Sequence, residues 1–336
     1  MFASKGEIVQ SLCEVGVDAT EAVMLAQQAR PAVELRVHPV ADESTIPIGA
    51  TKIGGRPDLP AGMEWRWRGP YPAECMDHLR QCIADPEKTW FWAEPEQRVE
   101  FLEDSKRALF AAESSFPLPF VAQINFAEMW AVGELDADMP HEGMLYLFYD
   151  VRQQPGGFNP QENVGFSVCY HPSITTLTRR ELPEQLISLK GMSRGRVFSC
   201  EARWHVSPLP YETQQWECLG LSEEAVEAVC DWQEESDDAS GYQIGGWPNV
   251  IQGDMQVECA LVSAGYDCGH SDAYKKPELA AVRATATEWL LLAQIDSDDH
   301  ENGWMWGDSG RLYVWIKRDD LKARRFELAQ VILQCY

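Results

Sequence analysis

Long hydrophobic segments are missing from this sequence of 336 residues. Its apolar runs, such as WLLLA at residues 289–293, are far shorter than the roughly 20 residues that cross a bilayer as a helix. The N-terminal segment MFASKGEIVQSL also lacks the apolar stretch of a secretory signal peptide. We therefore expect a cytoplasmic protein that has no membrane partner.

Closely spaced metal ligands are missing as well. The chain has ten cysteines, but no two are spaced as CxxC, and its seven histidines form neither HxH nor HxxxH. In a reducing compartment such scattered cysteines are small buried hydrophobes or free thiols. We expect neither a disulfide framework nor a structural zinc site, and we expect no cofactor.

Positive charge is in short supply. Lys and Arg number 28 against 53 Asp and Glu, which gives a formal net charge of −25. Nucleic acids and acidic lipid surfaces require a basic footprint, so this balance argues against both as partners. Two interpretations remain, namely solubility and attraction to a basic protein.

The acidic residues are concentrated in one stretch. Residues 223–238 contain eight carboxylates and no Lys or Arg. Ser222 is a suitable N-cap for a helix over residues 222–234, and acidic residues suit its first turn. The stretch is either a solvated helix face followed by a loop or a docking surface for a basic partner.

One tight turn is written twice, as IGGRP at residues 53–57 and IGGWP at residues 244–248. Paired glycines permit positive φ at both positions, and the proline keeps the preceding residue out of the helical region. Asp58 and Asn249, which follow the two prolines, can close an Asx turn. The pattern predicts a stiff, non-helical bend in both places.

Two further segments recur in the same order. VAQIN at 121–125 matches LAQID at 292–296, and GMLYLF at 143–148 matches GRLYVW at 310–315. Ordered matches of this kind indicate an internal duplication. We expect an α+β fold in which two similar β-rich halves form one compact body with peripheral helices. The expected divisions are residues 1–45 (N-terminal helices and a strand), 46–190 (first half, with an insertion at 64–115) and 191–336 (second half).

Local patterns predict further elements. Helical periodicity and capping residues indicate helices within residues 6–29, 95–113 and 319–329. Alternation of apolar and polar residues predicts strands at 32–37 and 196–206. The 196–206 strand bears on GMSRG at 191–195, which satisfies the G-x-S-x-G pattern of a nucleophile elbow. An elbow requires a helix after the serine, so we expect a hairpin turn there and not a nucleophilic Ser193.

Other polar groups form candidate sites. Lys52 and Arg56 flank the first glycine turn, which could hold a small anion or be purely structural. The loop in residues 294–313 departs from a calcium-binding EF-hand, because position 12 is Ser309 where a bidentate Glu is needed. An irregular cation site remains open there, with clustered carboxylates as ligands: Asp296, Asp298 and Asp308.

Gln123 and Gln294 lie within otherwise apolar strands. A buried amide must be hydrogen-bonded, so we expect each glutamine to tie its strand to the backbone of a glycine turn. The alternative is that both contact a ligand in a cleft between the halves, where small-molecule sites commonly lie. The candidate ligand-binding residues are Asp58, Gln123, Asn125, Gln294, Asp296, Asp308 and Arg311.

Several longer motifs together resemble the YwqG-like family, a bacterial domain of unknown function. They are PIGATKIGGRPDLPAG, PLPFVAQINFAEM, YQIGGWPNVIQGDM, WLLLAQIDSDD and MWGDSGRLYVWIKRDDL, and with GMLYLFYD they extend from about residue 30 to the end of the chain. The resemblance implies an α+β fold of two similar halves. It implies no established activity and supplies no catalytic residues.

We therefore expect a non-catalytic binding protein rather than an enzyme, one that engages a basic protein through its acidic surface in the manner of an immunity or adaptor protein. The alternative is a small-molecule-binding protein or enzyme with its site between the halves.

Overall fold

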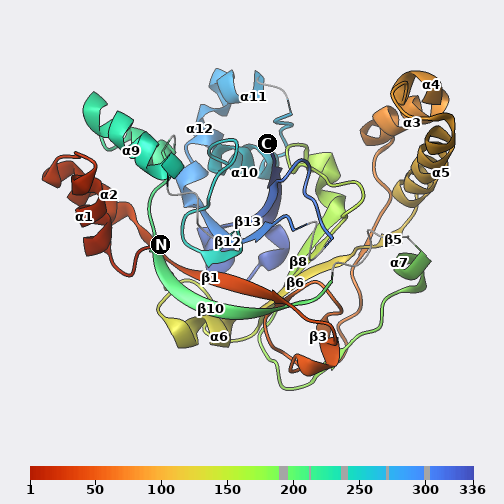
Figure 1. Cartoon of the computed structure of the whole chain (residues 1–336), viewed down its shortest axis with the longest axis horizontal. Helices are drawn as coiled ribbons and strands as arrows, with labels where there is room; N and C mark the ends of the chain where they lie inside the picture. The colour runs from red at the N-terminus through yellow and green to blue at the C-terminus, as the bar shows by residue number, and fades with distance from the viewer. Residues whose placement is uncertain (189–195, 212, 236–240, 270–271, 299–302) are drawn as a thin grey trace.

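A single sheet organises this α+β protein (Figure 1). The computed structural model describes residues 1–336 except 189–195, 212, 236–240, 270–271 and 299–302. Ten strands form the sheet in the order β14-β13-β12-β11-β1-β10-β2-β6-β7-β8. Their bounds are β1 Arg30–Pro39, β2 Lys52–Ile53, β6 Phe120–Asn125, β7 Met144–Tyr149, β8 Phe166–His171, β10 Phe198–Ser207, β11 Gln243–Gly245, β12 Trp289–Asp296, β13 Arg311–Lys317 and β14 Gln330–Gln334.

Every pairing within this sheet is antiparallel. The sheet curves until its two edges, β8 and β14, approach each other: Asn163, just before β8, donates from Nδ2 to Oε1 of Gln330 at 3.1 Å. Two small ribbons accompany it, one formed by β3 (Asp58–Pro60) with β9 (Leu177–Arg179) and one by β4 (Trp67–Arg68) with β5 (Phe116–Pro117).

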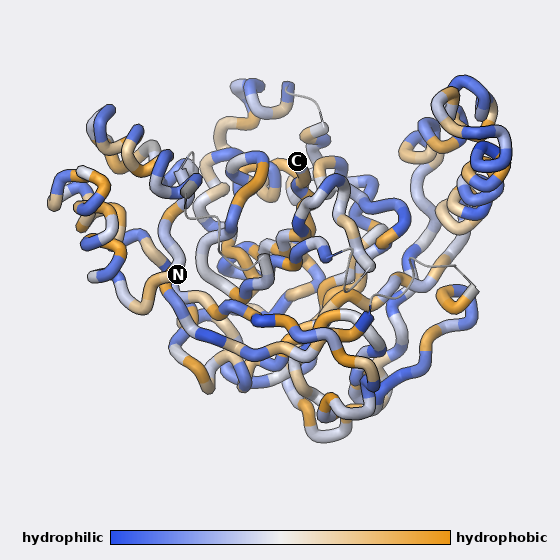
Figure 2. Tube along the Cα trace, in the orientation of Figure 1, coloured by the Kyte–Doolittle hydropathy of each residue, from blue (hydrophilic) through white to orange (hydrophobic). Residues whose placement is uncertain are grey.

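Many of the strands are apolar on both faces because both faces are covered; β1 and β10 differ, with exposed charged residues such as Arg36 and Arg203. In β7, Leu145, Leu147 and Tyr149 join the main core inside the curved sheet. The alternate residues, Met144, Tyr146 and Phe148, pack into a separate cluster on the outer face. β13 follows the same alternation, because successive strand side chains point to opposite faces. β12 does so except at a register shift, where Leu292 and Ala293 both join the main core. Figure 2 shows hydrophobic residues concentrated in the strands at the centre of the molecule.

The helices lie at the periphery in three groups (Figure 1). α1, α2 and α9 pack together on one side, α3–α5 lie on the other, and α10 packs against the outer face of β12–β14. Within the described residues no helix has the length and hydrophobicity needed to cross a membrane. The bounds are α1 Lys5–Glu14, α2 Ala19–Gln28, α3 Asp77–Ala84, α4 Pro86–Thr89, α5 Pro95–Ala112, α6 Phe126–Val132, α7 Glu184–Ser188, α8 Gln214–Glu217, α9 Glu223–Glu235, α10 Gln256–Ser263, α11 Asp272–Lys275, α12 Ala280–Arg283 and α13 Arg318–Lys322.

Most predicted elements are present, with one clear exception. The expected helix at 319–329 is wrong: α13 ends at Lys322, Arg324 has a left-handed φ of 59°, and a single 3-10 turn follows at Phe326–Leu328. The charge pattern favoured a helix, but burial of Phe326 and the pairing of β14 with β13 decide the conformation. The GMSRG motif and Ser193 lie outside the described residues.

Candidate functional site

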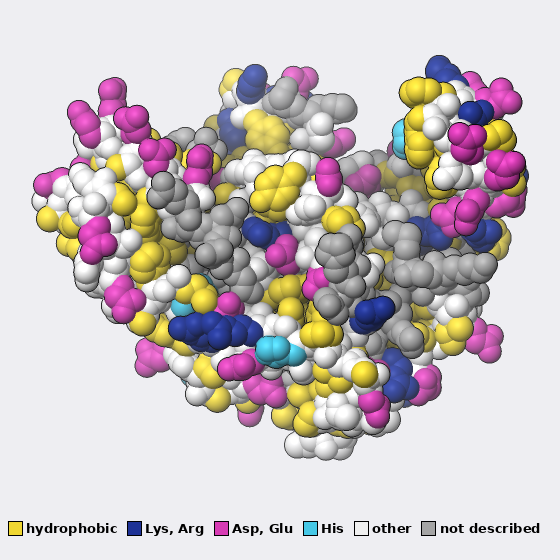
Figure 3. All heavy atoms as spheres, viewed as in Figure 1, with side chains coloured by type: hydrophobic (Ala, Val, Ile, Leu, Met, Phe, Trp, Pro, Cys, Tyr) yellow, Lys and Arg dark blue, Asp and Glu magenta, His cyan; other side chains and the backbone are white. Residues whose placement is uncertain are grey.

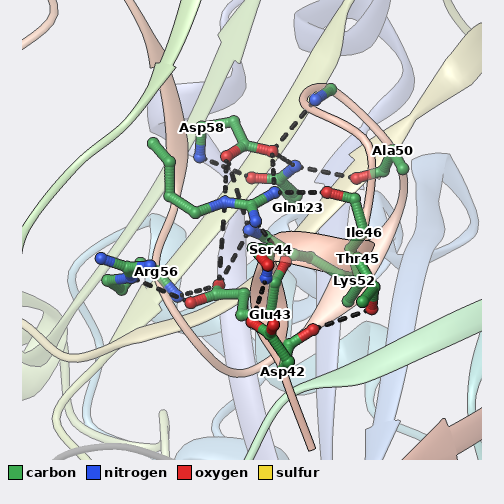
Figure 4. Close-up of polar contacts among 12 residues, drawn as sticks. Asp42, Glu43, Ser44, Thr45, Ile46, Ala50, Lys52, Arg56, Asp58 and Gln123 are labelled. Atoms are coloured by element: carbon green, nitrogen blue, oxygen red, sulfur yellow. Dashed lines mark hydrogen bonds and ion pairs between the residues drawn. The ribbon is translucent and has the colours of Figure 1, made fainter. Parts of the chain in front are cut away.

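The first glycine turn is held by Gln123 of β6 (Figure 4). Gly54 and Gly55 have φ of 71° and 74°, as the paired glycines predict. Oε1 of Gln123 accepts from the backbone N–H of Asp58 at 2.8 Å, and its Nε2 donates to the carbonyl of Ala50 at 2.8 Å. Nε2 also donates to Oδ2 of Asp58 at 2.9 Å. The amide therefore ties the strand to both sides of the turn.

The second turn is held in the same way by Gln294 of β12. Gly245 and Gly246 have φ of 68° and 73°. Oε1 of Gln294 accepts from the N–H of Asn249 at 2.9 Å, and Nε2 donates to the carbonyl of Gly241 at 3.1 Å. Both glutamines are completely buried. The prediction that each glutamine ties its strand to a glycine turn is confirmed.

A tyrosine adds a third matching bond at each turn. The hydroxyl of Tyr146 donates to the carbonyl of Asp58 at 2.7 Å, and that of Tyr313 donates to the carbonyl of Asn249 at 2.6 Å. Each tyrosine lies opposite its glutamine on the neighbouring strand. The two turns thus share their backbone conformation and their supporting polar groups.

The two turns differ in charge. At the first, Lys52 is fully buried, and its Nζ lies 3.0 Å from Oε1 of Glu43 and 3.5 Å from Oδ1 of Asp58. Nε of Arg179 lies 2.8 Å from the same Asp58 oxygen. At the second turn Gln243 occupies the position of Lys52 and Asn249 that of Asp58, so the corresponding contacts are neutral.

The buried charges stabilise one another against desolvation. Burial lowers the pKa of Lys52, and the charges of Asp58 and Glu43 oppose that effect. Burial alone would raise the pKa of Asp58, but hydrogen bonding from Arg179 and the charge of Lys52 hold it below its usual value. A buried ion pair is retained only where hydrogen bonds satisfy it, and this network meets that condition.

The first turn binds an anion, and the anion is a side chain of the protein. Oε1 of Glu43 accepts from the N–H of Arg56 at 2.7 Å, and Nε of Arg56 donates to Oε2 at 2.9 Å. A Cβ at Gly55 would lie 2.4 Å from the Glu43 oxygen, so glycine is required for this approach. At the second turn Oγ of Ser207 accepts from the N–H of Trp247 at 2.7 Å. A hydroxyl there replaces the carboxylate.

The seven candidate ligand residues fall into two groups and one isolated residue. Asp58 and Gln123 belong to the first turn, and Asn125 donates from Nδ2 to the carbonyl of Gly49 beside it at 2.8 Å. Gln123 and Gln294, which hold the two turns, lie on β6 and β12, and these strands are five steps apart along the sheet, or about 24 Å at the usual spacing of about 4.8 Å. The sheet therefore separates the first group from the second.

The second group surrounds Asn249. Arg311 lies 3.0 Å from Asp296 through Nε and donates from Nη1 to the carbonyl of Asn249 at 3.2 Å, beside Gln294. Asp308 is exposed and stands apart from both groups. Its backbone carbonyl accepts from the N–H of Tyr336.

The three proposed cation ligands lie within the described residues, whereas part of the loop between them does not. Asp296 pairs with Arg311, although burial raises its pKa, and Asp298 is half-buried. Across the described residues, no group of three or more His, Cys, Asp or Glu side chains is arranged to hold a metal ion. The intervening residues 299–302 lie outside the description, and the site at Asp296, Asp298 and Asp308 stays a prediction.

Two cavities lie elsewhere in the described part of the molecule, and none of the seven candidate residues lines either. One, of about 570 Å³, lies between β8 on one side and α10, β12 and the start of β14 on the other. The second, of about 320 Å³, lies where α9 meets β10 and the segment after the second glycine turn. Ligand pockets commonly fall between about 300 and 1,000 Å³, so both are large enough for a small ligand or a side chain.

The strongest surface feature is an acidic lobe formed by α1, α2 and α9. Segments more than 200 residues apart in the sequence come together here. Trp232 donates from Nε1 to Oγ of Ser11 at 2.8 Å, and the N–H of Ser222 donates to the carboxylate of Glu21 at 2.7 Å. Lys5 is the single Lys or Arg within the three helices. Figure 3 shows carboxylates spread over this lobe at the left of the view. Its exposed carboxylates are Glu7, Glu14, Asp18, Glu223, Glu224, Glu227, Asp231 and Glu234.

Sequence patterns identified the acidic run but not its neighbours. The acidity of 223–234 is visible in the sequence, whereas its union with α1 and α2 depends on contacts more than 200 residues apart in the chain. Two members of the charged network were also missed, namely Glu43, which pairs with Lys52, and Arg179, which pairs with Asp58. Glu43 lies outside any motif and Arg179 lies in a short strand, so the local sequence does not indicate that either residue is buried.

Comparison with known protein families assigns the chain to one of them. Residues 51–335 match the family described as Domain of unknown function (DUF1963). The chain therefore belongs to this family, which agrees with the resemblance to a domain of unknown function. The comparison with curated proteins gives no match.

Proposed function

We propose that this is a cytoplasmic, non-catalytic binding protein that docks a basic protein on its acidic lobe. The observation that carries the proposal is the charge of α1, α2 and α9, whose exposed carboxylates are accompanied by one lysine. Opposite charge on a partner accelerates encounter and selects against acidic competitors. The whole chain has a net charge of −25, so the rest of the molecule contributes to the same attraction.

The helices of the lobe suit a docking role. α9 is fixed to α1 and α2 through a buried cluster that includes Val229, Trp232 and Leu12. Its exposed positions, such as Glu223 and Glu227, face solvent. A partner would therefore meet a preformed surface, which reduces the entropy cost of binding.

The test is affinity capture with charge-reversed variants. The wild-type chain, Glu223→Lys/Glu227→Lys and the control Glu96→Lys/Glu100→Lys are used as bait at low salt. The control makes the same charge change on exposed positions of α5, on the other side of the molecule. We expect the wild type and the control to retain basic proteins that salt releases, and the α9 variant to lose them. Equal retention by both variants, or no basic protein on any bait, refutes the proposal.

A second candidate function is small-molecule binding in the 570 Å³ cavity, which separates residues 160–168 from residues 262–330. Two polar atoms in its wall have no hydrogen-bond partner, Nε1 of Trp289 and Oδ1 of Asn163. A buried group left unpaired costs about 1–3 kcal/mol, which a ligand that carries both an acceptor and a donor would recover. The geometry differs from the cleft expected from the sequence, because none of the seven candidate residues lines it.

Thermal unfolding in the presence of metabolites, nucleotides, anions and metals tests this candidate. A ligand that binds the native state raises the melting temperature according to its concentration relative to its Kd. Ser167→Trp, which fills the cavity, should abolish such a shift, whereas the control Ser173→Trp in the loop after β8 should keep it. A flat response from the wild type across the panel opposes this function.

We also infer that the chain is YwqG-like and arose by duplication, with halves at 46–190 and 191–336. What supports this is an offset of 191 residues between equivalent groups of the two turns, such as Lys52 and Gln243 (243 − 52) or Asp58 and Asn249 (249 − 58). The glutamines and tyrosines that hold the turns repeat in the same order, at offsets of 171 and 167 residues (294 − 123 and 313 − 146). Equivalent strands also follow each other outward from the β1–β10 pair on both sides. Comparison of each half with relatives that contain a single copy of the unit would test it. We expect each half to resemble such relatives more closely than unrelated sequences do.

A further inference from the structure

The 320 Å³ cavity opens beside the acidic lobe. Trp232 and Glu234 of α9 form part of its wall, and His205 and Trp247 form another part. Phe2 also lines it and stacks on Trp232, with ring centroids 5.5 Å apart. A partner that lies along α9 would therefore pass directly over an aromatic cavity.

One buried polar atom in this wall lacks a partner. His205 on β10 is 7% exposed, and its Nε2 has no hydrogen-bond partner. Burial lowers the pKa of His205 to about 4, so the imidazole is neutral at neutral pH. A neutral imidazole has one nitrogen that accepts a hydrogen bond. In the tautomer that carries its proton on Nδ1, the unpaired Nε2 is a buried acceptor for a ligand that carries donors.

The remaining wall chemistry favours a flat cation. The wall contains aromatic rings, prolines and the carboxylate of Glu234; its positive charge comes from the N-terminal amine of Met1, and no Lys or Arg side chain lines it. One of its rings already holds a guanidinium, because Cζ of Arg30 lies 3.4 Å from the ring centroid of Trp247. Guanidinium groups are planar, stack on aromatic rings and carry only donors. Lysine shares the charge but not the flat shape.

We propose that this cavity receives an arginine side chain of the basic partner, with the guanidinium against the aromatic wall, near Glu234, and donating to Nε2 of His205. The proposal rests on the proposed function, since the acidic face of α9 brings the partner to the cavity. It adds a specific contact to the general attraction, and it distinguishes arginine from lysine, which the acidic lobe alone does not.

Two peptides of equal charge test the proposal by calorimetry. One is a lysine-rich peptide, and the other has its central lysine replaced by arginine. The wild-type chain should bind the arginine peptide more tightly, by up to about thirtyfold, the limit that applies where the lysine ammonium gains nothing from the rings. Tyr211→Ala and His205→Leu, both in the cavity wall, should reduce this ratio to about one. An equal affinity of the wild type for the two peptides overturns the proposal, as does a ratio unchanged in both variants.

A second measurement needs no variant. In protein labelled with ¹⁵N at histidine, N-acetyl-arginine amide should shift the His205 ring signal, and N-acetyl-lysine amide at the same concentration should leave it in place. An unmoved His205 signal overturns the inference.

The two proposals can fail separately. Salt-sensitive binding of the lysine peptide that Glu223→Lys/Glu227→Lys weakens, without an arginine preference, keeps the acidic docking surface and refutes the cavity. Loss of both the salt sensitivity and the arginine preference refutes both.

Discussion

Replacement of each buried glutamine by leucine gives the sharpest test of how the sheet is held together. Gln123→Leu leaves two backbone groups without partners, the N–H of Asp58 and the carbonyl of Ala50. Gln294→Leu does the same to two backbone groups of the second turn. Each buried unpaired group costs about 1–3 kcal/mol, so each substitution should lower the free energy of unfolding by about 2–6 kcal/mol.

The two substitutions should not be equal. Gln123 also donates to the buried carboxylate of Asp58 at 2.9 Å, and hydrogen bonds to charged groups contribute about 1.5–3 kcal/mol. Gln123→Leu should therefore be the more destabilising by about 2 kcal/mol. The comparison is made within one protein, between two turns of the same conformation, which removes most differences of context.

Urea unfolding followed by tryptophan fluorescence measures both losses, since the chain has 13 tryptophans. The midpoint should fall while the slope stays constant, because the surface exposed on unfolding is unchanged. Gln10→Leu on the exposed face of α1 is the control, and it should change stability by under about 0.5 kcal/mol. Losses below about 1 kcal/mol at both turns would refute the role of the amides, and a larger loss at Gln294 would refute the contribution of the charge.

Three further predictions concern single groups. Lys52→Met should cost about 3–5 kcal/mol in urea unfolding, because it leaves its buried carboxylate partners uncompensated; a loss under about 1 kcal/mol would contradict this. Gly55→Ala should lower the free energy of unfolding by about 3 kcal/mol, because a positive φ is strained for alanine and its Cβ would clash with Glu43. The control Gly62→Ala has open space at φ +83° and should lower it by about 1–2 kcal/mol, from the strain alone. Equal losses would exclude the clash. Burial raises the pKa of Glu258 from 4.5 to about 7. Between these values the unfolded state releases the proton and the native state keeps it, so the native state loses up to about 3 kcal/mol of stability as pH rises through that range. Glu258→Gln should remove this loss, and unfolding of both proteins at pH 5 and pH 8 checks it; identical pH profiles would contradict the assignment.

Much of the architecture around the turns was visible in the sequence because it depends on local chemistry. Paired glycines need positive φ, and a lone amide in an apolar strand needs a partner, so the turns and the Gln123 and Gln294 ties could be predicted together. The strand order could not, because it depends on which edges meet in space. Nothing near Arg30 in the chain indicates that β1 pairs with a strand that ends at Ser207.

The site was predicted less well, for a physical reason. Carboxylates and amides near the turns looked like ligand contacts, but the structure shows Asp58 and Gln123 engaged with each other and with the backbone. Two of the described groups without partners, in Trp289 and His205, are an indole and an imidazole within strands. Their lack of hydrogen-bond partners depends on how the whole molecule packs, so no local sequence pattern could predict it.

The place of β1 in the sheet has a consequence for synthesis and for fragments. It pairs with both β10 and β11, and Ser207 follows its partner Arg30 by 177 residues (207 − 30). At a translation rate of about 5–20 residues per second, α1, α2 and β1 wait on the order of ten seconds or more before their partners emerge from the ribosome. β1 also precedes residues 51–335, the region of the family match. A fragment trimmed to that region would lose the strand between β10 and β11 and would present two unpaired edges in the middle of the sheet, the kind of edge from which proteins aggregate.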